Sequence, residues 1–237
     1  MRGPHSEYAP PPIYFTRDTG PRPGVRFSRD EMFQLGVAIA ALSAALTLAN
    51  VIGLQRAGAP GDLTVIGLLL VSALVAVSSG VGLHEVSHKI VAQRYGHWAE
   101  FRYNLRGLAL AFVFAFFGFL LGAPGATMIA GPVTPAQNGK ISAAGPGSNL
   151  VVGAVFLIAA TTVARTASAS DLVGLLVSFI FVNAWYMNVI LAGFNMIPVL
   201  PFDGAKVWAW NKAIYLGIIG LVIAMSLSGV YLGIAYI

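Results

Sequence analysis

Residues Leu63 to Tyr95 read LTVIGLLLVSALVAVSSGVGLHEVSHKIVAQRY, an apolar stretch of about 30 residues that is long enough to cross a membrane as one helix. Its second half contains His84 and His88. Because an α-helix turns once in about 3.6 residues, the two imidazoles project from the same face. Ionisable groups at membrane depth are costly and usually functional. The stretch therefore predicts a spanning helix that carries a polar site near one end.

The spacing His84-Glu85-x-x-His88 is typical of helices that hold Zn²⁺ with two imidazoles while the glutamate reaches the water bound to the metal. A catalytic zinc has three protein ligands and one open position. The chain contains no cysteine, so the ligands have to be imidazoles and carboxylates. Among the nine acidic residues, Asp203 is the best third ligand, because the others lie in the N-terminal tail, on the opposite side of the membrane or in and beside the motif. Read alone, Asp203-Gly204 also fits an ordinary turn.

The composition of the whole chain indicates an integral membrane protein. Of its 237 residues, 57% are hydrophobic and only 10% are charged, which is too apolar for an ordinary soluble domain. The net charge is +5, but the basic residues are scattered near the ends of apolar segments, which argues against nucleic acid as a partner. We expect a mostly disordered tail over residues 1–31 and one transmembrane domain over residues 32–237.

The other apolar segments predict an all-α polytopic membrane protein with about five to six transmembrane helices. Ser28-Arg29-Asp30-Glu31 has the form of a capping box, and further helices are expected over about 33–54, 148–164, 172–194 and 214–236. Asn149 is expected to cap or pack its helix, and Asn183 and Asn188 to form interhelical hydrogen bonds. His97 is expected at the membrane interface and not on the metal.

The segment from Gly107 to Phe119 fits either a helix or a strand. It is apolar enough for a helix, but its large side chains alternate with small ones, and a period of two favours a strand. Glycines and prolines follow, so we favour a β-hairpin or small sheet that dips into the membrane. This topology leaves Arg56 and Arg165 on one side and the other twelve of the 14 basic residues on the opposite side; a crossing would give ten against four. Cytoplasmic loops are enriched in Lys and Arg, so the N-terminus and the active-site side are predicted to be cytoplasmic.

Three motifs in order resemble the site-2 protease family of intramembrane zinc metalloproteases (peptidase family M50). They are His84-Glu85-x-x-His88, Ala144-Gly145-Pro146 followed by Asn149, and Asn195-x-x-Pro198-x-x-Pro201-x-Asp203-Gly204. The resemblance covers residues 63–211, the expected catalytic core. It implies one zinc ion on His84, His88 and Asp203, with Glu85 as the catalytic base and Asn195 near the reacting carbonyl. Asn195 fits a helix C-cap equally well.

The resemblance implies a hydrolase that cleaves single-span membrane proteins within their transmembrane segments, in contact with membrane lipid. A substrate helix has to unwind before its amides can be cut, and a strand over 107–119 offers an edge that the unwound segment can join. A zinc-binding transporter or sensor without hydrolysis would use the same buried ligands. An accidental motif in a structural membrane protein would bind no metal. Glu85 discriminates, because a site without hydrolysis has no use for a free carboxylate beside the metal.

Overall fold

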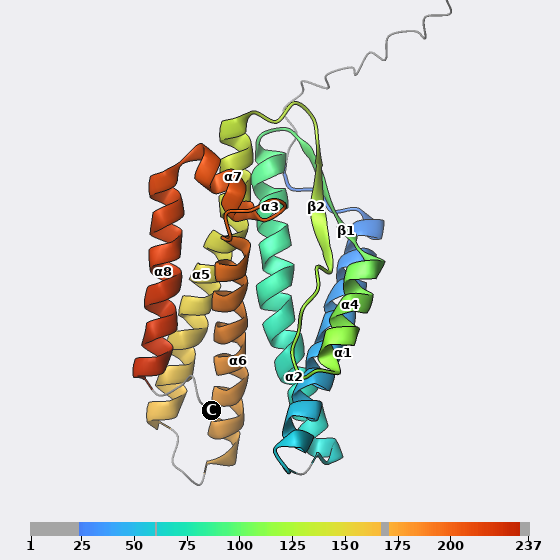
Figure 1. Cartoon of the computed structure of the whole chain (residues 1–237), viewed down its shortest axis with the longest axis vertical. Coiled ribbons are helices and arrows are strands. Elements are labelled where there is room, and N and C mark those ends of the chain that lie inside the picture. The colour runs from blue at the N-terminus through green and yellow to red at the C-terminus, as the bar shows by residue number, and fades with distance from the viewer. Residues whose placement is uncertain (1–23, 60, 167–170, 233–237) are drawn as a thin grey trace, which may run out of the picture.

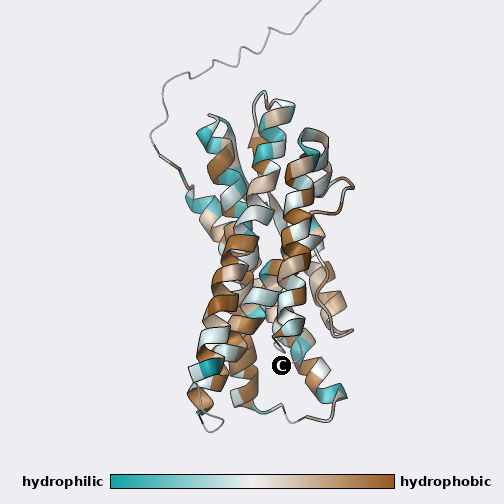
Figure 2. Ribbon diagram, turned by 90° about the vertical axis from the view of Figure 1, so that its left-hand side faces the viewer, coloured by the Kyte–Doolittle hydropathy of each residue, from teal (hydrophilic) through white to brown (hydrophobic). Residues whose placement is uncertain are grey.

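The computed structural model describes residues 24–59, 61–166 and 171–232, and it is mainly helical (Figure 1). Of the tail predicted over residues 1–31, residues 1–23 lie outside these ranges, and its last residues, Arg29 to Glu31, belong to the first helix. Within them, five helical stretches are long and apolar enough to cross a membrane: Arg29–Arg56, Leu63–Arg94, Pro135–Thr166, Leu172–Asn195 and Lys212–Gly229. Figure 2 shows apolar residues along the middle of these helices and hydrophilic residues at their ends. The prediction of a polytopic helical membrane protein with a small sheet is confirmed.

Helix α1 (Arg29–Arg56) begins at the predicted capping box. The Ser28 hydroxyl accepts a hydrogen bond from the backbone N–H of Glu31 at 3.1 Å, as expected for an N-cap. The Glu31 side chain does not complete the box. Its carboxylate is buried, pairs with the buried Lys89 and accepts the backbone N–H of Phe101 at 3.0 Å. Glu31, which was expected to belong to the tail, thus joins the start of α1 to the helix that carries the histidines.

The motif helix is one rod with a π-helical turn in its middle. It consists of α2 (Leu63–Val77), the π turn η1 (Ser78–Gly82) and α3 (Leu83–Arg94). A π turn widens the helix by one residue and often lies at a functional site. Here it ends at Gly82, two residues before His84.

The prediction of a strand within Gly107–Phe119 is wrong. Helix α4 (Leu105–Ala115) occupies most of this segment, and Asn104 caps it by accepting the N–H groups of Arg106 and Gly107. Its buried residues Leu108, Ala111 and Ala115 recur every three to four positions and pack on α1. The alternation of large and small side chains thus serves a helix whose small residues approach a neighbouring helix closely.

The small sheet forms from the residues on either side of α4. Strand β1 (Trp98–Tyr103) pairs antiparallel with β2 (Gly125–Ala130), in the register that places Trp98 opposite Ala130 and Phe101 opposite Thr127. The segment between Trp98 and Ala130 therefore begins and ends at the same place, as Figure 1 shows. With 11 residues, α4 is about 16 Å long and too short to cross the hydrocarbon core.

Helix α5 (Pro135–Thr166) starts well before the predicted position at Ser148 and runs through Pro146. A different capping box starts it, because the side chains of Thr134 and Gln137 each accept the other's backbone N–H, at 3.2 and 2.9 Å. Proline inside a membrane helix is tolerated where neighbouring groups replace the lost hydrogen bond. The motif around Gly145 and Asn149 is therefore the middle of a helix and not its beginning.

Helices α6 (Leu172–Asn195), α7 (Asp203–Trp210) and α8 (Lys212–Tyr231) complete the described chain. Asp171 caps α6 by accepting the N–H of Gly174 at 3.0 Å. Along its length α6 packs against α5, and α8 joins them through Val222 and Met225. Short α7 packs on α5 and lies beside α3 (Figure 1), and its first residue, Asp203, contacts the two histidines.

Candidate metal centre

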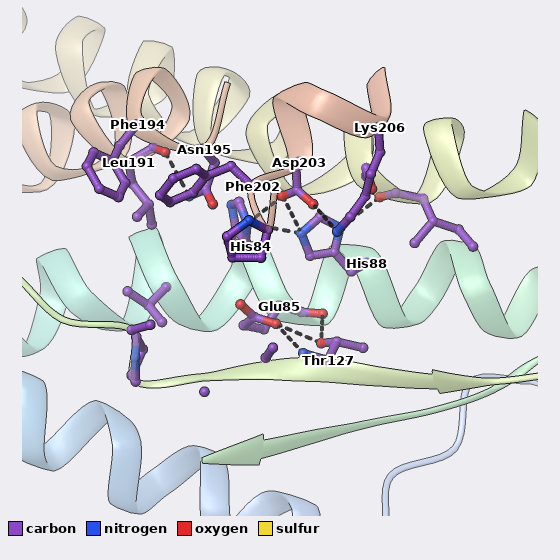
Figure 3. Close-up of a pocket in the computed structure, with 18 of the residues that line it drawn as sticks. His84, Glu85, His88, Thr127, Leu191, Phe194, Asn195, Phe202, Asp203 and Lys206 are labelled. Atoms are coloured by element: carbon purple, nitrogen blue, oxygen red, sulfur yellow. Dashed lines mark hydrogen bonds and ion pairs between the residues drawn. The ribbon is translucent and has the colours of Figure 1, made fainter. Parts of the chain in front are cut away.

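His84 and His88 of α3 meet Asp203 of α7, and all three side chains are buried (Figure 3). The Nε2 atoms of the two imidazoles are 3.0 Å apart. An Asp203 carboxylate oxygen lies 3.4 Å from Nε2 of His84 and 3.1 Å from Nε2 of His88. Residues more than a hundred positions apart in the sequence therefore converge on one point.

The chain between α6 and α7 brings Asp203 to this point. It is irregular from Met196 to Phe202, and α7 then begins with Asp203 in its first turn, where the helix dipole favours a negative charge. At Gly204 the backbone comes so close to the carbonyl of Met196 that a Cβ atom would collide with it. Tyr215 of α8 donates its hydroxyl to the same carbonyl at 3.0 Å. Glycine is thus required at position 204 by this close approach, which holds the start of α7 and Asp203 beside Met196.

The outer nitrogens of both imidazoles are tied to acceptors. Nδ1 of His88 lies 2.7 Å from the carbonyl oxygen of Ile141, and Nδ1 of His84 lies 2.6 Å from the side-chain oxygen of Asn149. Because an oxygen of this kind only accepts, each Nδ1 carries the proton and each Nε2 presents a lone pair to the centre. Three acceptor atoms facing one another at about 3 Å repel unless a cation lies between them. The residues present therefore fit a metal ion.

The Asp203 carboxyl lies outside the spanning helices. Burial alone would raise its pKa, but the rings of His88 and His84 outweigh burial and hold the pKa below its ordinary value. The group is therefore a carboxylate at neutral pH, which is the form that binds a metal. Two imidazoles and one carboxylate with a free fourth position are a zinc ligand set of the catalytic kind.

A cavity of about 280 Å³ opens beside the three ligands. Glu85 lines it from α3, Thr127 and Ile129 line it from β2, and Asn195 and Phe202 line it from the far wall. The cavity supplies the open side that a substrate needs next to a metal.

Glu85 is half-buried and projects from α3 on a different side from the imidazoles, toward β2 (Figure 3). Its carboxylate accepts the backbone N–H of Thr127 at 2.7 Å and the Thr127 hydroxyl at 2.8 Å. Thr127 stands opposite Phe101, whose own N–H is held by Glu31. Helix α3 therefore holds both strands at this pair of residues. Glu85 binds Thr127 of β2 directly, and Lys89 pairs with Glu31, which binds Phe101 of β1. Thr127 is a contact of the proposed base that no sequence motif indicated.

The contacts of the four asparagines agree with their predicted roles to different degrees. Asn195 lines the cavity, but its amide donates to the carbonyl of Leu191 in its own helix, and Met196 is the C-cap of α6. Asn149 is no helix cap: it is fully buried in the middle of α5 and contacts His84. Asn188 bonds across helices as predicted, whereas Asn183 bonds only to Phe179 of its own helix. His97 is buried beside Gln137 and lies outside the metal cluster.

Comparison with known proteins supports zinc as the metal of this centre. A relative from Methanocaldococcus jannaschii, named "Putative zinc metalloprotease MJ0611", is 41% identical to this chain over 156 residues, which make up 65% of this chain and 77% of the relative. The chain belongs to the zinc metalloproteases. No protein-family model and no solved structure matches it. The zinc of this metalloprotease fits the buried cluster of His84, His88 and Asp203, which can hold one metal ion.

The backbone of α5 passes close to both imidazoles of the metalloprotease at Gly145. A Cβ atom there would lie 2.5 Å from Nε2 of His88 and 2.6 Å from Cε1 of His84, closer than side-chain carbons come in folded proteins. Gly145→Ala is therefore expected to displace both rings and to weaken zinc binding by at least about 10-fold, measured by competition with a chelator. Gly147→Ala, on the same helix with open space around it, should bind zinc normally. Equal zinc affinity of the two variants would contradict the ring positions described above.

Proposed function

We propose that this metalloprotease is an intramembrane zinc endopeptidase of the site-2 protease type, which cleaves transmembrane segments of single-span membrane proteins. One observation carries the proposal: two of the three ligands lie on a helix long and apolar enough to cross a membrane, and the third comes from a short helix beside it. A cavity next to these ligands has strand β2 on one wall. The resemblance of the three motifs to that family supports the same conclusion.

Mapping the cut tests the proposal against an ordinary membrane-anchored protease. A purified single-span substrate is incubated with the protein, and the new termini are identified by mass spectrometry. Cleavage between residues of the apolar segment is expected. Cleavage confined to the polar flanks would show a protease that acts outside the membrane.

The roles of the residues follow from their positions. When bound, zinc lowers the pKa of its water to about 7 and polarises the carbonyl of the scissile bond. Glu85, at the cavity wall beside the ligands, is the base that takes the proton and passes it to the leaving amine. Asn195 faces the cavity from the opposite wall, where its amide can donate to the developing oxyanion once it leaves Leu191.

Strand β2 takes the place of the strand that we expected over 107–119. The N–H of Thr127 is donated to Glu85 and not to β1, so it lies on the outer edge of the sheet. Gly125 and Ile129, two residues to either side, present their backbone groups to the same edge and line the cavity. An unwound substrate segment can pair there by β-augmentation, within reach of the metal.

Substitution of Ile129 tests this edge. Ile129→Pro removes the outward N–H without removing a bond to β1, and Ile129→Ala shortens the side chain while it keeps the N–H. We expect Ile129→Pro to lose at least about 10-fold in the rate of substrate cleavage and Ile129→Ala to lose much less, both with normal zinc content. An equal loss in both variants would show that only the Ile129 side chain matters, through its packing near Ala99 and Ile141.

The end of the molecule that carries β1 and α7 is proposed to face the cytoplasm. Arg94, Arg102, Lys206 and Lys212 lie in or beside the elements at this end, whereas Arg56 ends α1 at the opposite end. Labelling of single introduced cysteines tests the orientation cleanly, because the chain has none of its own. A label at residue 211 that reacts only from outside the cell would reverse the assignment.

A further inference from the structure

Two buried asparagines and a half-buried serine form a chain of hydrogen bonds behind His84. Asn149 of α5 contacts His84, Asn188 of α6 contacts Asn149 at 2.9 Å, and Ser79 of the π turn contacts Asn188 at 3.1 Å. Both asparagines have no exposed surface and lie between apolar helices. We propose that Asn188 and Ser79 are positioning residues for zinc, which act through Asn149 to fix the orientation of His84. The proposal rests on the zinc centre and is independent of what the enzyme cleaves.

Two backbone carbonyls, those of Ala184 and Gly80, fix the direction of the bonds in this chain, because a carbonyl oxygen can only accept. The Asn188 amide nitrogen lies 2.8 Å from the carbonyl oxygen of Ala184, which can only accept, so the nitrogen points there and toward Ser79. The side-chain oxygen of Asn188 therefore faces Asn149 and accepts from its amide nitrogen. That same nitrogen also donates to the carbonyl of Gly80 at 2.8 Å. The oxygen of Asn149 is thus left to face Nδ1 of His84, and it can only accept.

This order decides which nitrogen of His84 binds the metal. With its proton held on Nδ1 by Asn149, the ring presents a lone pair at Nε2, toward His88 and Asp203. If the Asn149 amide were turned over, its N–H₂ group would meet Nδ1 and favour the opposite tautomer, with a proton at the metal position. His88 needs no such chain, because a backbone carbonyl, which cannot turn over, holds its Nδ1.

The π turn takes part through its backbone. Gly80 lies in η1, and its carbonyl receives the Asn149 amide. A Cβ atom at Gly80 would come within 3.0 Å of Met187 on α6, so the turn packs tightly against the helix that carries Asn188. The widened turn therefore places Gly80 and Ser79 around the two asparagines.

The experiment compares two asparagines of the same helix. Asn188→Ala breaks the chain, whereas Asn183→Ala removes an amide that bonds only within α6. The zinc dissociation constant is measured by chelator competition, and the visible spectrum of the Co²⁺-substituted protein reports the geometry of the metal ligands. We expect Asn188→Ala to weaken zinc binding by about 10-fold and to shift the cobalt bands, and Asn183→Ala to change neither. Equal effects of the two variants would show that Asn188 contributes only to packing between helices and does not position His84.

A second pair of variants tests the orientation itself and keeps the proposal testable if Asn188→Ala folds poorly. Asn149→Asp offers an accepting oxygen whichever way the group turns, so its orientation no longer needs to be fixed. Asn149→Asp with Asn188→Ala should therefore bind zinc as tightly as Asn149→Asp alone. If Asn188→Ala weakens zinc binding in this background as much as in the natural protein, Asn188 does not act through the orientation of residue 149, and the proposal is wrong.

Discussion

Glu85→Gln is expected to abolish cleavage while the protein keeps its zinc. The amide has the shape of the carboxylate and can still accept from Thr127, but it cannot take a proton from water. A general base typically contributes 10²- to 10⁴-fold to a rate, so we expect a loss of at least about 10²-fold in kcat. Zinc content, measured by elemental analysis, should stay near that of the natural protein, because Glu85 is outside the ligand cluster.

Glu100→Gln is the matched control for this variant. Glu100 lies on β1 and pairs with Arg102, away from the cavity, so its amide should leave cleavage within about twofold. If Glu85→Gln lost zinc, and the natural protein cleaved nothing, a transporter or sensor that binds zinc without hydrolysis would be favoured. Full activity of Glu85→Gln would show that Glu85 is not the catalytic base.

Asp203→Ala is expected to lose the zinc itself. Without the carboxylate, the two imidazoles remain as the only protein ligands of the cluster, and the negative charge that offsets the dication is gone. We expect zinc affinity to fall by roughly 10³-fold or more, with cleavage lost in parallel. Chelator competition measures the affinity, and excess zinc should restore part of the activity if the fold is intact.

The control for this variant is Asp171→Asn. Asp171 caps α6 at the far end of the molecule, and asparagine is an equally good cap, so zinc affinity and stability should be unchanged. Normal zinc content in Asp203→Ala would mean that another residue is the third ligand. That outcome would contradict the proposed convergence of α3 and α7.

The metal ligands could be predicted from the sequence because the chemistry restricts the choice. His84 and His88 share a helical face by their spacing alone, and in a chain without cysteine few acids are placed to complete the site. The spanning helices could be predicted as well, because apolar runs of this length have no other common explanation. Local sequence pattern and composition were therefore sufficient to predict the ligand cluster and the spanning helices.

The parts that the sequence did not reveal depend on tertiary contacts. Asn149 was expected to cap or pack a helix that starts after Pro146, and only the packing of α5 against α3 shows that it contacts His84. The partnership of Glu31 with Lys89 joins residues 58 positions apart. One missed signal was local: Thr134-Pro135-Ala136-Gln137 has the form of a capping box with proline at the first helical position, and it marks the true start of α5.

We propose that one zinc ion, held by His84, His88 and Asp203, makes this chain a protease of transmembrane segments. This proposal is tested most directly by stripping the purified protein with a chelator and titrating zinc back while cleavage of a single-span substrate is followed. The account predicts no cleavage in the stripped protein and full recovery at one zinc per chain. Cleavage that persists without metal, or that fails to return when one zinc per chain is bound, would contradict it.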